Sequence, residues 1–209
     1  GLRKKSKIDN QIEKMSAEDS FRAIRLAQIV VLVLDANMAF EKQDLQIAQH
    51  VIDEGRVLIL AVNKWDAVKD RNEAKNKIRY RLDTGLGQIR DIPYVTISAK
   101  NGKNIECIFD LALQHYDIWN RRVSTGSMNR WLKGMESQNP APLVGGRQNR
   151  LKYITQIKTR PPTYALWVSQ PKELPKSYRR YLINGLRRDF DIPSVPIRLL
   201  VRTSKNPYS

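Results

Sequence analysis

The sequence predicts an α/β domain built on a parallel sheet, followed by a small α+β domain. An unbroken apolar run at residues 57–62 is short enough for a strand that helices cover on both faces. Similar runs alternate with stretches of helical periodicity as far as Trp119, which is typical of a parallel sheet. Near Arg122 the order of elements changes. We therefore expect domains at residues 1–122 and 123–209.

The first domain is expected to begin with a polar, basic segment at residues 1–15, which we interpret as a mobile loop. Ser16 and Asp19 then resemble a capping box and predict the start of a helix. The expected strands are residues 29–34 and 57–62, both buried, and a further short strand at residues 93–97. The expected helices are residues 43–54, 71–82 and 104–119. One face of the last helix carries the side chains that we expect in the core, namely Ile105, Ile108, Phe109, Ala112, Tyr116 and Trp119.

The second domain is expected to run helix, strand, strand, helix, strand. The corresponding segments are residues 128–136, 151–157 and 163–168, a helix from Pro175, and residues 197–201. Pro140, Pro142 and the pair Gly145–Gly146 indicate an extended loop after the first of these helices.

Composition excludes several classes of protein. With 41% hydrophobic and 28% charged residues the chain should be globular rather than disordered. No apolar run approaches the length of a membrane span. The single cysteine, Cys107, cannot form an internal disulfide and favours a reducing compartment. His50 and His115 have no metal-ligand neighbours in the sequence, so we expect no metal site.

Charge is distributed unevenly. Residues 1–122 hold 21 Lys/Arg and 17 Asp/Glu, a net charge of +4, whereas residues 123–209 hold 16 and 4, a net charge of +12. The second domain is therefore the part expected to meet polyanions.

An Asn63-Lys64-Trp65-Asp66 tetrapeptide follows the apolar run at residues 57–62. Ligands of parallel α/β folds bind beyond the carboxyl ends of the strands, where this tetrapeptide would fall. The Asp66 carboxylate can accept two hydrogen bonds from adjacent donors on a guanine edge, a pair that adenine does not offer. Asn63 would brace the loop, and the Lys64 stem would lie along the purine face.

A second loop, Ser98-Ala99-Lys100, follows the expected strand at residues 93–97. In a parallel sheet its strand end would lie beside the first, so that the Ala99 N–H reaches the guanine carbonyl and Lys100 covers the other purine face. Taken alone, the tetrapeptide is equally typical of a solvated turn. The two loops together predict a guanine-nucleotide site.

With these two loops, the sequence resembles the Der/EngA family of tandem-domain GTPases, in which two G domains precede a KH-like domain. The resemblance implies that the chain is the second G domain, of the P-loop type, from the end of an Asp-x-x-Gly motif at Gly1 onward. Residues 2–20 would then be the switch II segment, and the remainder a KH-like domain. It also implies GTP or GDP as ligand with Mg²⁺, a cytoplasmic location, and hydrolysis in the intact protein during large ribosomal subunit assembly.

The sequence departs from that pattern in several ways. No G-x-x-x-x-G-K-S/T segment occurs, so the loop that would hold the phosphates is missing, as are the switch I threonine and the Asp of Asp-x-x-Gly. We expect the chain either to have been cut or to represent an ordered part of a longer protein, and to have no GTPase activity by itself. Position 2 is Leu, so no catalytic side chain is identified. The KH-like part also lacks a G-x-x-G loop.

A basic surface is expected on the last helix and the closing strand. Its residues are Lys176, Arg179, Arg180, Arg187, Arg188, Arg198 and Arg202. It could meet duplex RNA, a ribosomal protein or the other G domain, with the large ribosomal subunit or its precursors and ribosomal RNA as the expected partners. A charge run is also typical of a plain solvated face. The competing function is a non-catalytic RNA- or protein-binding module on a G-domain scaffold.

Overall fold

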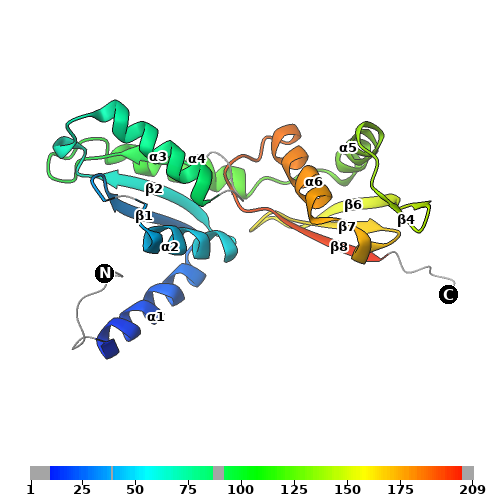
Figure 1. Ribbon diagram of the computed structural model, residues 1–209, viewed down its shortest axis with the longest axis horizontal. Helices are drawn as coiled ribbons and strands as arrows, with labels where there is room; N and C mark the ends of the chain where they lie inside the picture. Colours follow the sequence, from blue (N-terminus) through cyan, green and yellow to red (C-terminus); the bar gives the residue numbers. More distant parts are fainter. Residues whose placement is uncertain (1–9, 39, 87–91, 204–209) are drawn as a thin grey trace. The chain divides into compact units, whose positions relative to one another are not determined.

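The computed structural model describes residues 10–38, 40–86 and 92–203, which form two compact units (Figure 1). The first unit extends to Tyr116 and includes Ser194–Pro196; the second comprises Asp117–Pro193 and the chain from Ile197 onward. The domain boundary expected after residue 122 stays a prediction.

The first unit contains a parallel sheet in the order β1-β2-β3, as expected. Its strands are β1 (Ile29–Asp35), β2 (Val57–Asn63) and β3 (Tyr94–Thr96). Its helices are α1 (Asn10–Leu26), α2 (Lys42–Asp53), the 3-10 turn η1 (Trp65–Ala67), α3 (Arg71–Gly85) and all but the last three residues of α4 (Glu106–Trp119). The register places Asp35 at the end of β1 opposite Asn63 at the end of β2.

The central strand β2 carries the core of this unit. Residues 57–62 are all buried, which confirms the prediction that both of its faces are covered. Leu58, Leu60 and Val62 belong to one hydrophobic cluster with side chains of α1, α2 and α3. Since successive strand side chains point to opposite faces, Val57, Ile59 and Ala61 fill the other side. The helix α2 ends as expected, with Gly55 at a φ of 77° just beyond it.

The expectation that residues 29–34 form a buried strand is only half right. Val31 and Val33 are 37% and 57% exposed, whereas Leu34 is buried. Among the described residues β1 pairs only with β2, so it forms an edge of the sheet. An apolar run alone does not distinguish an edge strand from a central one.

Two further expectations for this unit are wrong. Phe109 is 66% exposed and outside the core, and Leu113, one turn further on, is 68% exposed. The helical periodicity assigned Phe109 to the buried face of this helix. The buried face of α4 is narrower than the part of its surface that carries apolar side chains. The first helix also begins at Asn10 rather than at Ser16. Residues 10–15 contain Gln, Glu, Lys and Met, which favour helix, and no residue that would stop the helix from extending.

The second unit contains a sheet in the order β6-β7-β8, antiparallel between β6 and β7 and parallel between β7 and β8. Its main elements are α5 (Thr125–Gln138), β6 (Leu151–Lys158), β7 (Thr163–Val168), η2 (Pro171–Glu173), α6 (Lys176–Asp189) and β8 (Arg198–Thr203). Their order confirms the expected α+β pattern. The loop expected between α5 and β6 instead contains a short hairpin, β4 (Leu143–Val144) and β5 (Arg147–Gln148). Gly145 and Gly146 close it with φ values of 56° and 75°, which suit a tight hairpin turn.

Both helices of this unit pack on the same side of the sheet, as Figure 1 shows. The Asn129 side chain of α5 acts as a partner for the edge of β6: its Oδ1 accepts from Ile154 N at 3.1 Å and its Nδ2 donates to Ile154 O at 2.9 Å. The Tyr178 hydroxyl of α6 donates to Asn139 O at 2.7 Å, which ties α6 to the end of α5. At Gly185 a Cβ would lie 2.5 Å from Met135 Cε and 3.0 Å from Trp131 Cζ2, so a larger residue there would require these side chains of α5 to shift.

No helix among the described residues combines the length and the apolarity that crossing a membrane requires.

Candidate nucleotide site

The two loops that the sequence singles out meet at the carboxyl edge of the sheet. The Ser98 hydroxyl donates to Asp66 Oδ1 at 2.6 Å. The Ala99 N–H donates to Asn63 Oδ1 at 2.9 Å. Each loop therefore fixes a functional group of the other, although the partners are more than thirty residues apart in sequence.

Trp65 anchors the first loop to the sheet. The Trp65 side chain is buried in the core of the unit. The backbone N–H of Trp65 donates to Ile97 O, at the end of the neighbouring strand, at 3.0 Å. Ile97 N–H in turn donates to Val62 O at 2.8 Å. The backbone thus joins the two strand ends directly beneath the polar side chains.

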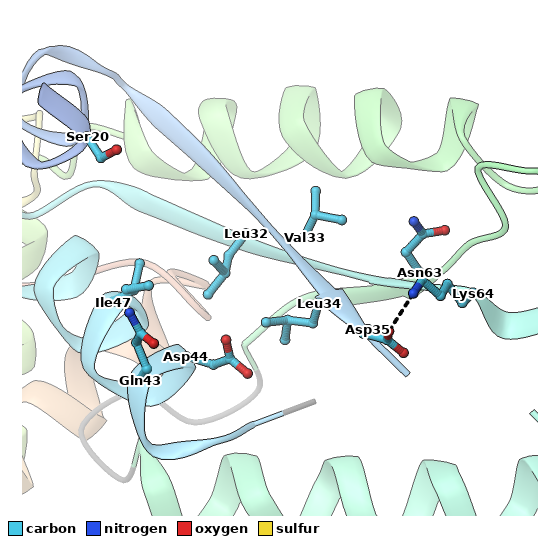
Figure 2. Close-up of a pocket in the computed structure, with 10 residues that line it drawn as sticks. All are labelled: Ser20, Leu32, Val33, Leu34, Asp35, Gln43, Asp44, Ile47, Asn63 and Lys64. Atoms are coloured by element: carbon cyan, nitrogen blue, oxygen red, sulfur yellow. Dashed lines mark ion pairs between the residues drawn. The ribbon is translucent and has the colours of Figure 1, made fainter. Parts of the chain in front are cut away.

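Lys64 is held in an unusual conformation. Its φ of 64° is left-handed, which costs a residue with a Cβ on the order of 1–3 kcal/mol. Its Nζ lies 2.8 Å from Asp35 Oδ2, at the end of β1 (Figure 2). The ion pair thus directs the ammonium toward the end of β1 while 61% of the Lys64 side chain stays exposed. That exposure leaves the stem accessible to a flat ligand.

Asp66 is poised as an anion. The Ser98 hydrogen bond is the largest cause that lowers the pKa of this carboxyl, followed by a backbone hydrogen bond and by the positive charge of Lys100, while desolvation opposes them. An ionised carboxylate is an acceptor at both oxygens. This is the state that recognition of two adjacent N–H donors requires.

The second loop is closed on itself. Ser98 and Lys103 exchange two backbone hydrogen bonds of 3.1 and 3.0 Å. Gly102 occupies the turn between them with a φ of 68°, a left-handed conformation that glycine adopts without strain. Asn104 Nδ2 donates to Thr96 O at 2.9 Å, which fastens the end of the loop to β3.

A cavity of about 470 Å³ lies beside these loops (Figure 2). Its lining comprises Ser20, Leu32, Val33, Leu34, Asp35, Gln43, Asp44, Ile47, Asn63 and Lys64. Asn63 and Lys64 belong to both the cavity and the paired loops, whereas Asp66 and Ser98 are outside the lining. The cavity and the edge formed by the paired loops are therefore neighbouring features, and Asp66 belongs only to the edge.

Sequence reasoning assigned no role to Asp35, which the structure places against Lys64. The sequence could have identified Asp35, because it is a polar residue at the end of an apolar strand, the same pattern that singled out Asn63. Gly1, the other residue expected to contact nucleotide, lies outside the described residues. No group of three or more metal-ligating side chains is found in the part of the chain that the structure describes.

The basic residues of the second unit differ in their surroundings. Arg179 donates from Nε to Leu174 O at 3.2 Å and from Nη2 to Pro171 O at 3.1 Å, which fastens η2 to α6. Burial lowers the pKa of Arg187 to about 10. Arg188 pairs with Asp189 at 2.6 Å. The exposed members of the set are Lys176, Arg180, Arg188, Arg198 and Arg202.

Comparison with known protein families matches both units. The profile described as the elongation factor Tu GTP binding domain matches residues 17–117. The profile described as KH-domain-like of EngA bacterial GTPase enzymes, C-terminal, matches residues 122–202.

Curated relatives match along the whole chain. The protein named GTPase Der from Brucella anthropi is 49% identical over 209 residues, all of this chain and 43% of that protein. The one from Ruegeria pomeroyi is 45% identical over 210 residues, again all of this chain and 43% of that protein. The chain thus spans less than half the length of these relatives. A crystal structure of Aquifex aeolicus Era bound to GDP and AlF4⁻ aligns with a TM-score of 0.46 and 14% identity, covering 97% of this chain and 74% of that one.

Proposed function

This chain is homologous over its whole length to the Der/EngA family of GTPases, and from that premise we propose that the intact protein binds guanine nucleotides, hydrolyses GTP and acts as a switch in ribosome biogenesis. The first unit is a G domain, and the second is a KH-like domain.

The observation that carries the proposal is the hydrogen bond from Ser98 to Asp66 at 2.6 Å. It keeps the carboxylate ionised and oriented at the edge of the sheet, where the ring N–H and amine of guanine would donate to it. Lys64 and Lys100 would cover the two purine faces with their stems. Asn63 braces the second loop through Ala99, the role that we expected for it.

The Ala99 N–H has two prospective partners. In the structure it donates to Asn63, whereas the proposal has it donate to the guanine carbonyl oxygen. Binding of the base would therefore transfer this donor from the Asn63 side chain to the ligand, or share it between them. The Asn63 amide could turn its own donor toward the base at the same time.

The phosphates and Mg²⁺ are assigned to residues outside this chain. These 209 residues contain no G-x-x-x-x-G-K-S/T segment and no Asp of an Asp-x-x-Gly motif. Catalysis of phosphoryl transfer depends mainly on positioning and on electrostatic stabilisation of the phosphates. The groups described here would accordingly select the base, and no catalytic side chain is assigned.

The second part of the proposal concerns the binding partner of the KH-like domain. We propose that this domain contacts the large ribosomal subunit or its precursors through ribosomal RNA or a ribosomal protein, or that it contacts the other G domain of the same protein. The proposal is supported by the net charge of +12 on residues 123–209 and by the exposed arginines of α6 and β8.

Hydrolysis tests the proposal directly. The intact protein should release phosphate from GTP, Asp66→Ala should suppress that release at limiting GTP, and the 209-residue chain should release none. Asp83→Ala, which removes an exposed carboxylate from α3 of the same unit, is the matched control and should leave hydrolysis unchanged. Equal rates for Asp66→Ala and Asp83→Ala would refute the assignment of Asp66.

The competing function, a binding module without catalysis, predicts a different result. An intact protein that binds ribosomal RNA but neither binds nor hydrolyses GTP would establish it. The same measurements therefore decide between the two.

A further inference from the structure

The helices α5 and α6 cover one face of the sheet of the KH-like domain. On the opposite face Tyr153, Ile157 and Leu200 of the edge strands are exposed, whereas Ala165 and Thr163 of the central strand are buried. Ile154, Leu166 and Val201 are partners across the three strands and point toward the helices, where Ile154 and Leu166 are fully buried. Because side chains alternate along a strand, the neighbouring row points the opposite way. That row consists of Tyr153, Trp167 and Arg202.

This row forms a continuous set of flat groups. The rings of Tyr153 and Trp167 lie with centroids 5.5 Å apart and planes inclined by 57°. The Arg202 guanidinium carbon lies 5.7 Å from the centre of the Trp167 ring, in the range of a cation–π contact. Tyr153 is 43% exposed, so this residue is accessible from solvent.

Charge on the same strands has a single sign. The charged residues of β6, β7 and β8 are Lys152, Lys158, Arg198 and Arg202, and none of the three strands contains an acidic residue. Lys158 of β6 and Arg198 of β8 both pair with Thr163 of β7. Thr163 lies two residues from Ala165 and four from Trp167, so these two cations lie on the same face of the sheet as Tyr153. Ile157 and Leu200, exposed by 38% and 41%, add apolar surface between the aromatic row and this basic end.

We propose that this open sheet face binds unpaired RNA, with one base stacked on Tyr153 and the backbone directed along the strands toward Lys158 and Arg198. Trp167 supports the Tyr153 ring from the side, and Arg202 packs against Trp167. Aromatic platforms on a sheet, bordered by cations, suit single-stranded RNA because every base offers a flat face and its phosphates are anionic. A duplex keeps its bases stacked on each other and offers no face to Tyr153.

The inference rests on the proposed RNA contact of this domain, and it shares Arg198 and Arg202 with the basic residues named there. It differs in excluding the exposed side of α6 and in naming an unpaired ligand. It also supplies a means of binding that does not need the G-x-x-G loop, which this sequence lacks. The alternative occupant of the face is another protein domain, which the apolar residues Ile157 and Leu200 would equally suit.

Binding to two RNA probes tests the proposal in the intact protein. The probes are octauridylate, which is single-stranded, and a short blunt RNA duplex, each measured at one fixed salt concentration. Tyr153→Leu, which keeps apolar bulk but removes the ring, should weaken octauridylate binding about fivefold or more. It should change duplex binding less than twofold, and Tyr153→Phe should bind octauridylate as the parent does.

Tyr80→Leu is the matched control. Tyr80 is a 66% exposed tyrosine on α3 of the other unit, and its replacement should affect neither probe. Circular dichroism of each variant excludes loss of fold as the cause, and guanine-nucleotide affinity of each variant shows separately whether the proposed G-domain function stands.

Three results would overturn the proposal. These are a parent that does not bind octauridylate, a Tyr153→Leu variant that loses both probes equally, and a Tyr153→Leu variant that binds like the parent. If octauridylate binding is unchanged while Tyr153→Leu shifts thermal unfolding of the intact protein, the face is covered by another protein domain instead.

Discussion

The paired loops of the G domain and the basic surface of the KH-like domain present their polar groups by opposite means. In the G domain, Asp66 and Asn63 are each fixed by a hydrogen bond from the neighbouring loop. In the KH-like domain, cations such as Lys176 and Arg180 project from one helix into solvent. Directed hydrogen bonds give selectivity between similar ligands, whereas solvated charges give attraction that salt weakens. The two regions should therefore differ in how they respond to salt and to single substitutions.

Salt should separate the two regions most strongly. If three phosphates are contacted, the affinity of the 209-residue chain for ribosomal RNA should fall roughly 20–40-fold between 50 and 200 mM salt, because log affinity changes by about 0.7–0.9 per contact for each unit of log salt. The affinity of the intact protein for GDP should change far less. A flat response of RNA binding would show that the basic residues only solvate the surface.

Substitutions of Arg179 and Arg180 should have different effects, although the sequence analysis assigned both residues to one basic surface. Arg179 donates to two backbone carbonyls, so Arg179→Ala should lower the free energy of unfolding by about 1.5–3 kcal/mol. Arg180 is exposed, so Arg180→Ala should leave stability unchanged and reduce the salt slope of RNA binding by about 0.7–0.9 if it touches a phosphate. Chemical denaturation and salt titration of both variants check the pair. Equal stabilities would show that the Arg179 contacts contribute nothing.

Glycine substitutions in the two helices of the KH-like domain should have opposite signs. At Gly185 an added Cβ meets Met135 and Trp131, and Gly185→Ala should destabilise the domain by about 1 kcal/mol or more. At Gly134, in α5, nothing lies within 4 Å of the added atom, and Gly134→Ala should stabilise it by roughly 0.4–1 kcal/mol. Thermal unfolding measures both. Destabilisation by both would mean that helix α5 is packed differently from what the structure shows.

Loss of the hydrogen bond between Ser98 and Asp66 should change the pKa of the Asp66 carboxyl. Because the pKa of Asp66 is lowered in the folded state, its ionisation favours that state above the ordinary aspartate range, and the contribution is lost as pH falls through the lowered pKa. Ser98→Ala removes the largest cause, so the pKa of Asp66 should rise toward its ordinary value and the contribution of its ionisation to stability should become smaller. Carboxyl NMR titration of Asp66 in both proteins checks this. An identical pKa in the two would contradict the bond.

Much of the fold followed from local pattern. Residues 57–62 are apolar throughout and fill a central strand, and Pro175 and Gly55 mark helix ends correctly. The failures arose where the outcome depends on neighbours rather than on the segment itself. Val33 and Phe109 are apolar but exposed, and their burial depends on what packs beside β1 and α4. The Gly145–Gly146 hairpin was missed because its strands are only two residues long.

The candidate site was predictable in its residues but not in its contacts. Asn63, Asp66, Ser98 and Ala99 were identified because two polar loops follow adjacent strands. That Ser98 donates to Asp66, and Ala99 to Asn63, depends on the register of β2 and β3, which spacing in the sequence does not fix. The ion pair between Lys64 and Asp35 depends in the same way on the register of β1 and β2.

The central claim is that Asp66 reads the guanine edge, and nucleotide selectivity of the intact protein tests it most directly. Asp66→Asn replaces an acceptor by an amide that mismatches the guanine donors, and the loss of charge-assisted bonds should weaken GTP binding by about 2–4 kcal/mol. The same amide suits the carbonyl oxygen that xanthine carries in place of the guanine amine, so xanthosine triphosphate should bind more tightly to the variant than to the parent. Competition titrations measure the affinities of the parent and of Asp66→Asn for GTP and for xanthosine triphosphate. Asp83→Asn serves as the control. Unchanged GTP affinity together with no gain for xanthosine triphosphate would contradict the account.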